Sequence, residues 1–90
     1  MDIEKKRAEI DEIDAYITKL FLRRMQICGE IGHYKKDNDI RVYDEEREKE
    51  IFARVKSMTP TENMREYTEL LYETVIGLAN AYQLEIRNED

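Results

Sequence analysis

The sequence has few of the residues that interrupt helices or cross-link small proteins. Its 90 residues include one proline, Pro60, and three glycines, and runs of β-branched residues are nearly absent, which disfavours strands. A single cysteine, Cys28, excludes an internal disulfide. With His33 as the one histidine, the chain has too few ligands for a Cys/His metal site. We therefore expect an all-α chain that holds no metal.

Long apolar runs and basic clusters are also missing. No stretch approaches the roughly 20 apolar residues of a membrane-spanning helix, and the N-terminal residues MDIEKKRAEID lack the apolar core of a signal peptide. The formal net charge of −6 opposes binding to nucleic acid or to an anionic membrane. We expect a cytoplasmic protein in which any anionic ligand is bound by a local cluster of cations.

The chain is short enough to form a single domain, residues 1–90, with a small core. A domain of this size buries a modest share of its surface, so a second copy of the chain often completes the core. Charged residues make up 40% of the sequence, which, with so few helix breakers, favours long amphipathic helices. We therefore expect a homo-oligomer of helical chains.

Apolar residues at heptad spacing predict a long first helix from about Asp2 to Lys36. They are Ile3, Ile10, Ile13, Ile17, Leu20, Ile27, Ile31 and Tyr34. The polar segment 35–41 is predicted to form a loop, because Asp and Asn side chains compete with the helical backbone for hydrogen bonds.

Two more helices are predicted after this loop. The second begins near Asp44, an acid suited to a helix N-terminus, and runs toward Met58. The third follows a capping box at residues 59–62 with Pro60 at the first helical position, and it becomes regular either there or only near Met64. The charged tail, residues 87–90, is expected to fray. The predicted buried stripe of the third helix comprises Met64, Tyr67, Leu71, Val75, Leu78 and Tyr82.

Two cations interrupt the apolar stripe of the first helix. Arg24 and Lys35 lie eleven residues, about 16 Å, apart along one side of that helix. A buried cation without a partner is costly, so either acids of another helix or a bound anion must meet these side chains. In the first case Arg24 pairs with an acid on the helix seam and Lys35 extends to solvent. In the second case the two cations bind a small dianion.

Further polar residues share this inward side. Asp44 and Glu48 stand one turn apart on the apolar face of the second helix, with Arg47 at its edge. Carboxylates among cations are suited to accept a hydrogen bond from a ligand hydroxyl. Gln83 follows the inner side of the third helix, so its amide is either an inward donor or a solvated group near the helix end.

Arg7 flanks the same stripe but lies seventeen residues, about 25 Å, from Arg24. One small molecule cannot contact both side chains from one straight helix. If Arg7 serves a site, it serves the site of a second copy. An antiparallel pairing of two first helices in a C2 dimer would place it there.

These residues, in this order and at these separations, resemble the small all-helical class of chorismate mutase over nearly the whole chain. The block LFLRRMQICGEIGHYK carries Arg24 and Lys35, residues 42–48 resemble the motif V-x-D-x-x-R-E, and Gln83 matches a late glutamine. The resemblance implies an intertwined antiparallel homodimer of three-helix chains. It also implies a cofactor-independent isomerase of the shikimate pathway that rearranges chorismate to prephenate for the biosynthesis of Phe and Tyr.

The resemblance further assigns a role to each matching residue. Lys35 and Gln83 would donate hydrogen bonds to the ether oxygen of chorismate, and Arg24 would bind a carboxylate, which makes these three the catalytic set. Asp44 and Glu48 would hold the region of the ring hydroxyl. The full substrate-binding set implied by the resemblance is Arg24, Lys35, Asp44, Arg47, Glu48 and Gln83, with Arg7 contributed by the second subunit.

The sequence departs from the family pattern at two positions. Arg41 stands where many members have proline, and Ala79 stands where some members have a serine that helps to bind a carboxylate. Two other functions stay open. An isochorismate-pyruvate lyase is similar in fold and uses a similar cationic pocket, and a non-catalytic helical dimerisation module would need Arg24 only as a partner for a seam acid.

Overall fold

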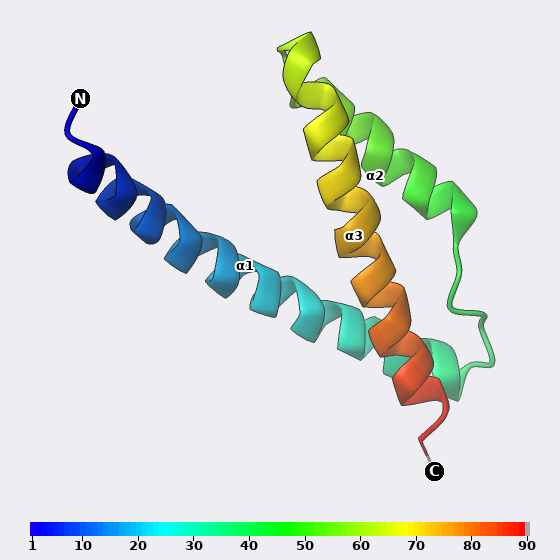
Figure 1. Ribbon diagram of the computed structural model, residues 1–90. Helices are drawn as coiled ribbons and strands as arrows, with labels where there is room; N and C mark the ends of the chain where they lie inside the picture. The colour runs from blue at the N-terminus through cyan, green and yellow to red at the C-terminus, as the bar shows by residue number, and fades with distance from the viewer. Residues whose placement is uncertain (90) are drawn as a thin grey trace.

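The computed structural model describes residues 1–89, which form three helices: α1 (Ile3–Asp37), α2 (Glu45–Ser57) and α3 (Glu62–Arg87). The prediction of an all-α chain is confirmed for these residues. Helix α3 packs against both α1 and α2, whereas α1 and α2 make no direct backbone contact within residues 1–89. Figure 1 shows α3 crossing α1 near its C-terminal end, while the N-terminal half of α1 extends away from the other helices.

Polar side chains fix both ends of α1. The Asp2 carboxylate accepts hydrogen bonds from the backbone N–H groups of Glu4 and Lys5 at 3.1 and 3.2 Å, which satisfies donors that the helix leaves free. At the other end, the Asn38 amide donates to the carbonyl of Tyr34 at 2.8 Å. Asp39 then adopts a positive φ of 54°. The predicted loop at 35–41 therefore starts at residue 38, and Lys35 belongs to the helix.

The capping box predicted at residues 59–62 does not form. Thr61, not Thr59, is the N-cap of α3, and it makes no side-chain capping hydrogen bond. The Thr59 hydroxyl instead donates back to the carbonyl of Val55 at 2.8 Å and contacts the Thr68 hydroxyl at 3.1 Å. Thr59 is buried, so its hydroxyl closes the end of α2 rather than the start of α3, and Pro60 precedes the helix.

Two glycines of α1 allow α3 to approach closely. A Cβ atom at Gly29 would lie 2.8 Å from the ring of Tyr82, and one at Gly32 would lie 3.0 Å from Cγ of Gln83 and 3.3 Å from Cδ1 of Ile86. Ile86 is 2% exposed and Gln83 is 5% exposed. The absence of side chains at these positions therefore lets α3 bury Gln83 and Ile86 against α1.

The prediction of which face α3 buries is wrong within this chain. Five of its six residues are exposed, and Val75 is half-buried. The face that α3 buries is a neighbouring one, made of Ile76, Ala79, Gln83 and Ile86. The reason is the crossing at Gly32, which fixes the rotation of α3 and leaves Met64, Tyr67, Leu71 and Leu78 of the predicted stripe uncovered, whereas the Tyr82 ring packs beside Gly29.

The first half of α1 is also uncovered. Its heptad residues Ile3, Ile10, Ile13, Ile17 and Leu20 are each more than half exposed, and the expectation that they face a core is not met by this chain alone. The radius of gyration is 16.3 Å, against about 12 Å for a compact domain of this length. No helix within residues 1–89 combines the length and apolar content needed to cross a membrane.

The C-terminal turn of α3 is held to the end of α1 and to the loop after it, contrary to the expectation of fraying for residues 87–89. Arg87 donates to the carbonyl of Ile40 and pairs with the Asp39 carboxylate at 3.1 Å. Lys36 donates to the carbonyl of Ile86 at 3.1 Å and also to that of Glu89. Residue 90 lies outside the described residues. These contacts fix the path of the loop that leads to α2.

Replacement of Gly32 by alanine is expected to lower the free energy of unfolding by about 1–2 kcal/mol. The added methyl group meets Gln83 and Ile86, which cannot yield without losing their own packing, and such overpacking costs about 1–3 kcal/mol. Alanine recovers up to about 1 kcal/mol through its higher helix propensity. Urea unfolding would measure the change. Gly77→Ala is the control, because a Cβ there meets nothing within 4 Å. Equal stability of the two variants would show that the α1–α3 crossing is not tight.

Candidate active site

A cavity of about 330 Å³ lies where the three helices converge. Helix α1 forms one wall, α2 and the residues before it form the opposite wall, and α3 lies between them. Buried Ile51 and Ile76 form part of the apolar surface. Six of the seven residues expected from the sequence to bind a substrate line this cavity: Arg24, Lys35, Asp44, Arg47, Glu48 and Gln83.

Lys35, which lines the cavity, is held from two sides. Its ammonium group donates to the carbonyl of Val42 at 2.7 Å and to Oε1 of Gln83 at 3.4 Å. Val42 is buried at the end of the loop after α1. An ammonium group carries three donors, so one N–H remains for a ligand. The interpretation in which Lys35 extends to solvent is therefore wrong for this chain.

Gln83 is an inward amide rather than a solvated one. It is among the most buried polar residues of α3, and its Nε2 atom donates to the carbonyl of Cys28 at 2.8 Å. This bond and the contact from Lys35 fix which way the amide faces. An amide nitrogen carries two hydrogens, so one donor is engaged by α1 and the other is left for the cavity.

Arg24 is half-buried on the α1 wall. Its guanidinium contacts Sγ of Cys28 at 3.7 Å, and within residues 1–89 neither Arg24 nor Lys35 forms an ion pair with a carboxylate. An acid of residues 1–89 is therefore not the partner of these two half-buried cations. The cavity leaves both groups available to an anion.

The two acids of the α2 wall differ in their surroundings. Asp44 is exposed and caps α2, because its carboxylate accepts from the backbone N–H of Arg47 at 3.1 Å. Glu48 is half-buried and accepts from the Asn80 amide at 3.3 Å. The Arg47 guanidinium pairs with Glu50 at 3.1 Å on the exposed rim. Both acids were predicted to point inward. The structure agrees for Glu48, whereas the Asp44 carboxylate is exposed and is bound to the start of α2.

Sequence reasoning missed three contributors to the cavity: the carbonyl of Val42, and the side chains of Arg54 and Asn80. A backbone carbonyl leaves no sequence signal. Arg54 follows Ile51 by three residues, and Asn80 precedes Gln83 by three, so helical spacing places both beside inward residues. That spacing was the available signal, and it is weak because either side chain is common on a solvated face.

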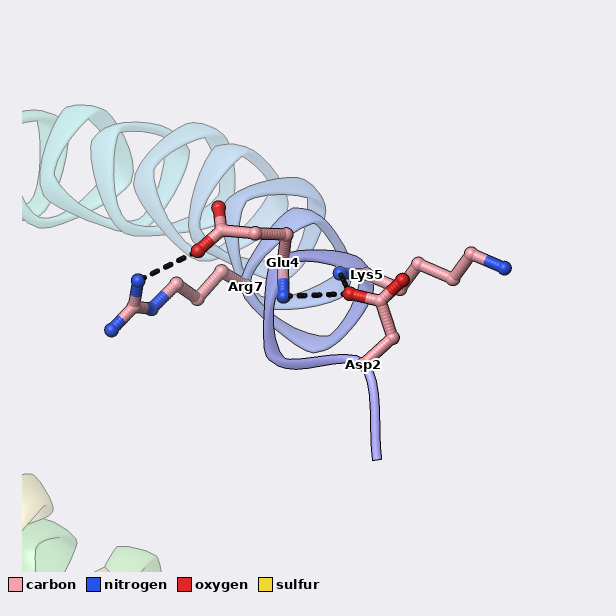
Figure 2. Close-up of polar contacts among 4 residues, drawn as sticks. All are labelled: Asp2, Glu4, Lys5 and Arg7. Atoms are coloured by element: carbon pink, nitrogen blue, oxygen red, sulfur yellow. Dashed lines mark hydrogen bonds and ion pairs between the residues drawn. The ribbon is translucent and has the colours of Figure 1, made fainter.

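Arg7 lies outside the cavity. It is near the start of α1, where its guanidinium pairs with the Glu4 carboxylate at 2.8 Å and its side chain is 63% exposed. Figure 2 shows this pair beside Asp2 and Lys5. These residues belong to the N-terminal arm of α1, which extends away from α3 (Figure 1). Because α1 is one continuous helix, the separation of about 25 Å between Arg7 and Arg24 is preserved.

The charges around the cavity oppose those of the whole chain. Four cations, Arg24, Lys35, Arg47 and Arg54, and two carboxylates, Asp44 and Glu48, line it, which leaves two net positive charges in a protein of net charge −6. Local cations of this kind attract a ligand more strongly inside a cavity than in open water. The cavity is therefore suited to a small dianion that also carries a hydrogen-bonding group for the carboxylates.

Comparison with known proteins agrees with this arrangement. The chorismate mutase type II family matches residues 6–84. A chorismate mutase from Methanocaldococcus jannaschii is 30% identical, over 93% of this chain and 90% of that protein. A 3-dehydroquinate dehydratase from Pyrobaculum aerophilum is 26% identical over 87% of this chain, but the chain spans only 23% of that protein's length. No solved structure gives a significant match. The match over most of the chain shows that this protein belongs to the chorismate mutase type II family.

Proposed function

We propose that this member of the chorismate mutase family uses the cavity to convert chorismate to prephenate. One observation carries the proposal: Lys35 and Gln83, from two different helices, lie in contact in a cavity with two net positive charges, and each keeps an N–H that the protein does not engage. Chorismate carries two carboxylates, an ether oxygen and a ring hydroxyl. The cavity offers cations, neutral donors and carboxylate acceptors that complement these groups.

The reaction is a [3,3] rearrangement within one molecule, in which the ether C–O bond breaks as a new C–C bond forms. It needs no nucleophile and no proton transfer. The enzyme must hold the compact conformer and stabilise the negative charge that develops on the ether oxygen. Lys35 and Gln83 each keep a free donor for that oxygen. Their hydrogen bonds strengthen as the C–O bond opens, which lowers the barrier rather than only binding the substrate.

The other cavity residues hold the substrate in place. Arg24 binds one carboxylate, with Arg47 assisting from the α2 wall. Asp44 and Glu48 accept hydrogen bonds from the hydroxyl region. Ala79 lines the cavity but has no hydroxyl to offer, so the carboxylate contact made by a serine in some family members is absent here.

The active form is proposed to be an antiparallel homodimer. The protruding half of α1 and the uncovered stripe of α3 expose rows of large apolar side chains, and exposed apolar surface of this kind marks a site of association. Pairing two α1 helices in opposite directions would cover both arms. It would also bring Arg7 of each subunit toward the cavity of the other, where a second guanidinium would complete the binding of the two carboxylates.

Residues 1–90 are proposed to act as one catalytic domain in the synthesis of Phe and Tyr. The cytoplasmic location expected from the sequence stays a prediction.

A spectroscopic assay of chorismate consumption, with identification of the product, tests the proposed activity. We expect prephenate, while release of pyruvate from isochorismate would instead assign the lyase reaction. A bicyclic analogue of the transition state, at about 100 times its Kd, should stabilise the folded protein by about 2.7 kcal/mol. This corresponds to a rise in Tm of about 10 °C or more. Absence of both turnover and a shift in Tm would favour a non-catalytic dimerisation module.

A further inference from the structure

We infer that Asn80 is a positioning residue that fixes the Glu48 carboxylate for binding the substrate hydroxyl. This inference rests on the proposed function and deepens it, because it explains how one acid keeps its place in a cavity rich in cations. Asn80 belongs to α3 and Glu48 to α2, and both line the cavity. Nδ2 of Asn80 donates to Oε2 of Glu48 at 3.3 Å.

The bond from Asn80 keeps the Glu48 carboxylate from turning toward a cation of the cavity. A glutamate side chain has three rotatable bonds, and ordering it costs up to about 1.5–2 kcal/mol. Without a fixed partner, the Glu48 carboxylate would turn toward a guanidinium of the cavity, of which Arg24, Arg47 and Arg54 are the candidates. An ion pair of that kind would occupy both an acceptor needed for the hydroxyl and a cation needed for a carboxylate.

A neutral amide is the partner that avoids this loss. Its N–H stabilises the ionised carboxylate, and hydrogen bonds to charged groups are stronger than those between neutral ones. It adds no charge, so the balance of Arg24, Lys35, Arg47 and Arg54 against Asp44 and Glu48 is unchanged. The bond engages Oε2, and Oε1 of Glu48 is left to accept from the substrate.

Position 80 is otherwise a poor place for asparagine. Asn80 lies in the interior of α3, where asparagine is less favourable than alanine by several tenths of a kcal/mol. The side chain is half-buried rather than solvated. It bonds to Glu48 of α2 and lies one helical turn after Ile76, a member of the buried cluster with Ile51, so the amide is held close to packed apolar residues.

The test is the kinetics of Asn80→Ala on chorismate. Loss of the bond should raise KM about tenfold while kcat changes less than twofold, because the hydroxyl contact binds substrate and transition state alike. Binding of the transition-state analogue should weaken by a similar factor. A merely structural role would lower Tm and the active fraction, and so reduce kcat at constant KM.

A double-mutant cycle with Glu48→Ala separates positioning from a direct contact. If Asn80 acts through Glu48, then adding Asn80→Ala to Glu48→Ala should change kcat/KM less than twofold. Losses that multiply in the double variant would overturn the inference. Should Asn80→Ala fail to fold, Asn80→Asp keeps the shape, removes the donor and places a like charge beside Glu48, so it should raise KM still further.

Asn63→Asp is the matched control. It makes the same change in the same helix, seventeen residues and about 25 Å from Asn80, and should leave KM and kcat unchanged. The two proposals fail in different ways. A wild-type protein without mutase activity would contradict the proposed function and, with it, the role of Asn80. An active wild type with an unaltered KM in Asn80→Ala and Asn80→Asp would overturn the role of Asn80 alone.

Discussion

Replacement of Lys35 by alanine is expected to lower kcat by about 10²–10³-fold, the range found when one preorganised donor to a developing oxyanion is removed. The Lys35 ammonium is a charged donor of the cavity, fixed by its bonds to the Val42 carbonyl and to Gln83. Its contribution grows as the ether bond opens, so the loss should fall on kcat more than on KM. Steady-state kinetics on chorismate measures both constants.

The fold should survive this substitution. Lys35 is half-buried and its stem packs at the end of α1, but the tight crossing of α1 and α3 depends on the glycines and not on Lys35. Circular dichroism and urea unfolding check this. Lys49→Ala is the matched control, since the Lys49 side chain is 75% exposed on α2 and should leave turnover unchanged. A Lys35→Ala enzyme with near wild-type kcat would remove Lys35 from the mechanism.

Arg7→Ala and Arg24→Ala are each expected to inactivate the enzyme by more than tenfold, and a mixture of the two should regain activity. In the proposed dimer each cavity uses Arg24 of one subunit and Arg7 of the other. A hybrid of the two variants then contains one intact cavity and one that lacks both guanidiniums. Random exchange makes half of all dimers hybrid, so recovery should reach about a quarter of wild-type activity, as two-fold symmetry requires.

The experiment needs subunits that exchange, for example by refolding the two variants together after denaturation. Arg23→Ala is the control for Arg24→Ala, because Arg23 is the adjacent cation of α1 but is exposed and bonds to Gln26 at 3.1 Å. It should keep full activity alone. A mixture that stays inactive, although size-exclusion chromatography shows dimers, would contradict a cavity shared between subunits.

The helices and part of the site could be predicted because both follow from local periodicity. Heptad spacing gave α1 to within one residue at each end, and Asp44 marked the start of α2 as its N-cap. The same period placed Arg24 and Lys35 on one side of α1, where both line the cavity. These predictions need only the 3.6-residue turn of a helix and the rule that buried charge needs a partner.

The rotation of α3 could not be predicted from its own pattern. The helix has two apolar faces, and the larger one is exposed in this chain while the face with Gln83 is buried. The choice depends on Gly29 and Gly32 of α1, which lie some fifty residues earlier in the sequence. The capping box predicted at residues 59–62 fails for a similar reason, a contact with another helix. The Thr59 hydroxyl bonds to the carbonyl of Val55 in α2 and contacts the Thr68 hydroxyl.

By itself, the sequence determined the helical class of this protein, the length of its helices and the presence of inward cations, because each of these depends on residues close together along the chain. The tertiary structure alone decided which groups meet. It joined Lys35 to the Val42 carbonyl and to Gln83, and Glu48 to Asn80. Such pairs bring together residues on different elements, and their distances are set by how closely the helices approach, which no periodic pattern within one helix encodes.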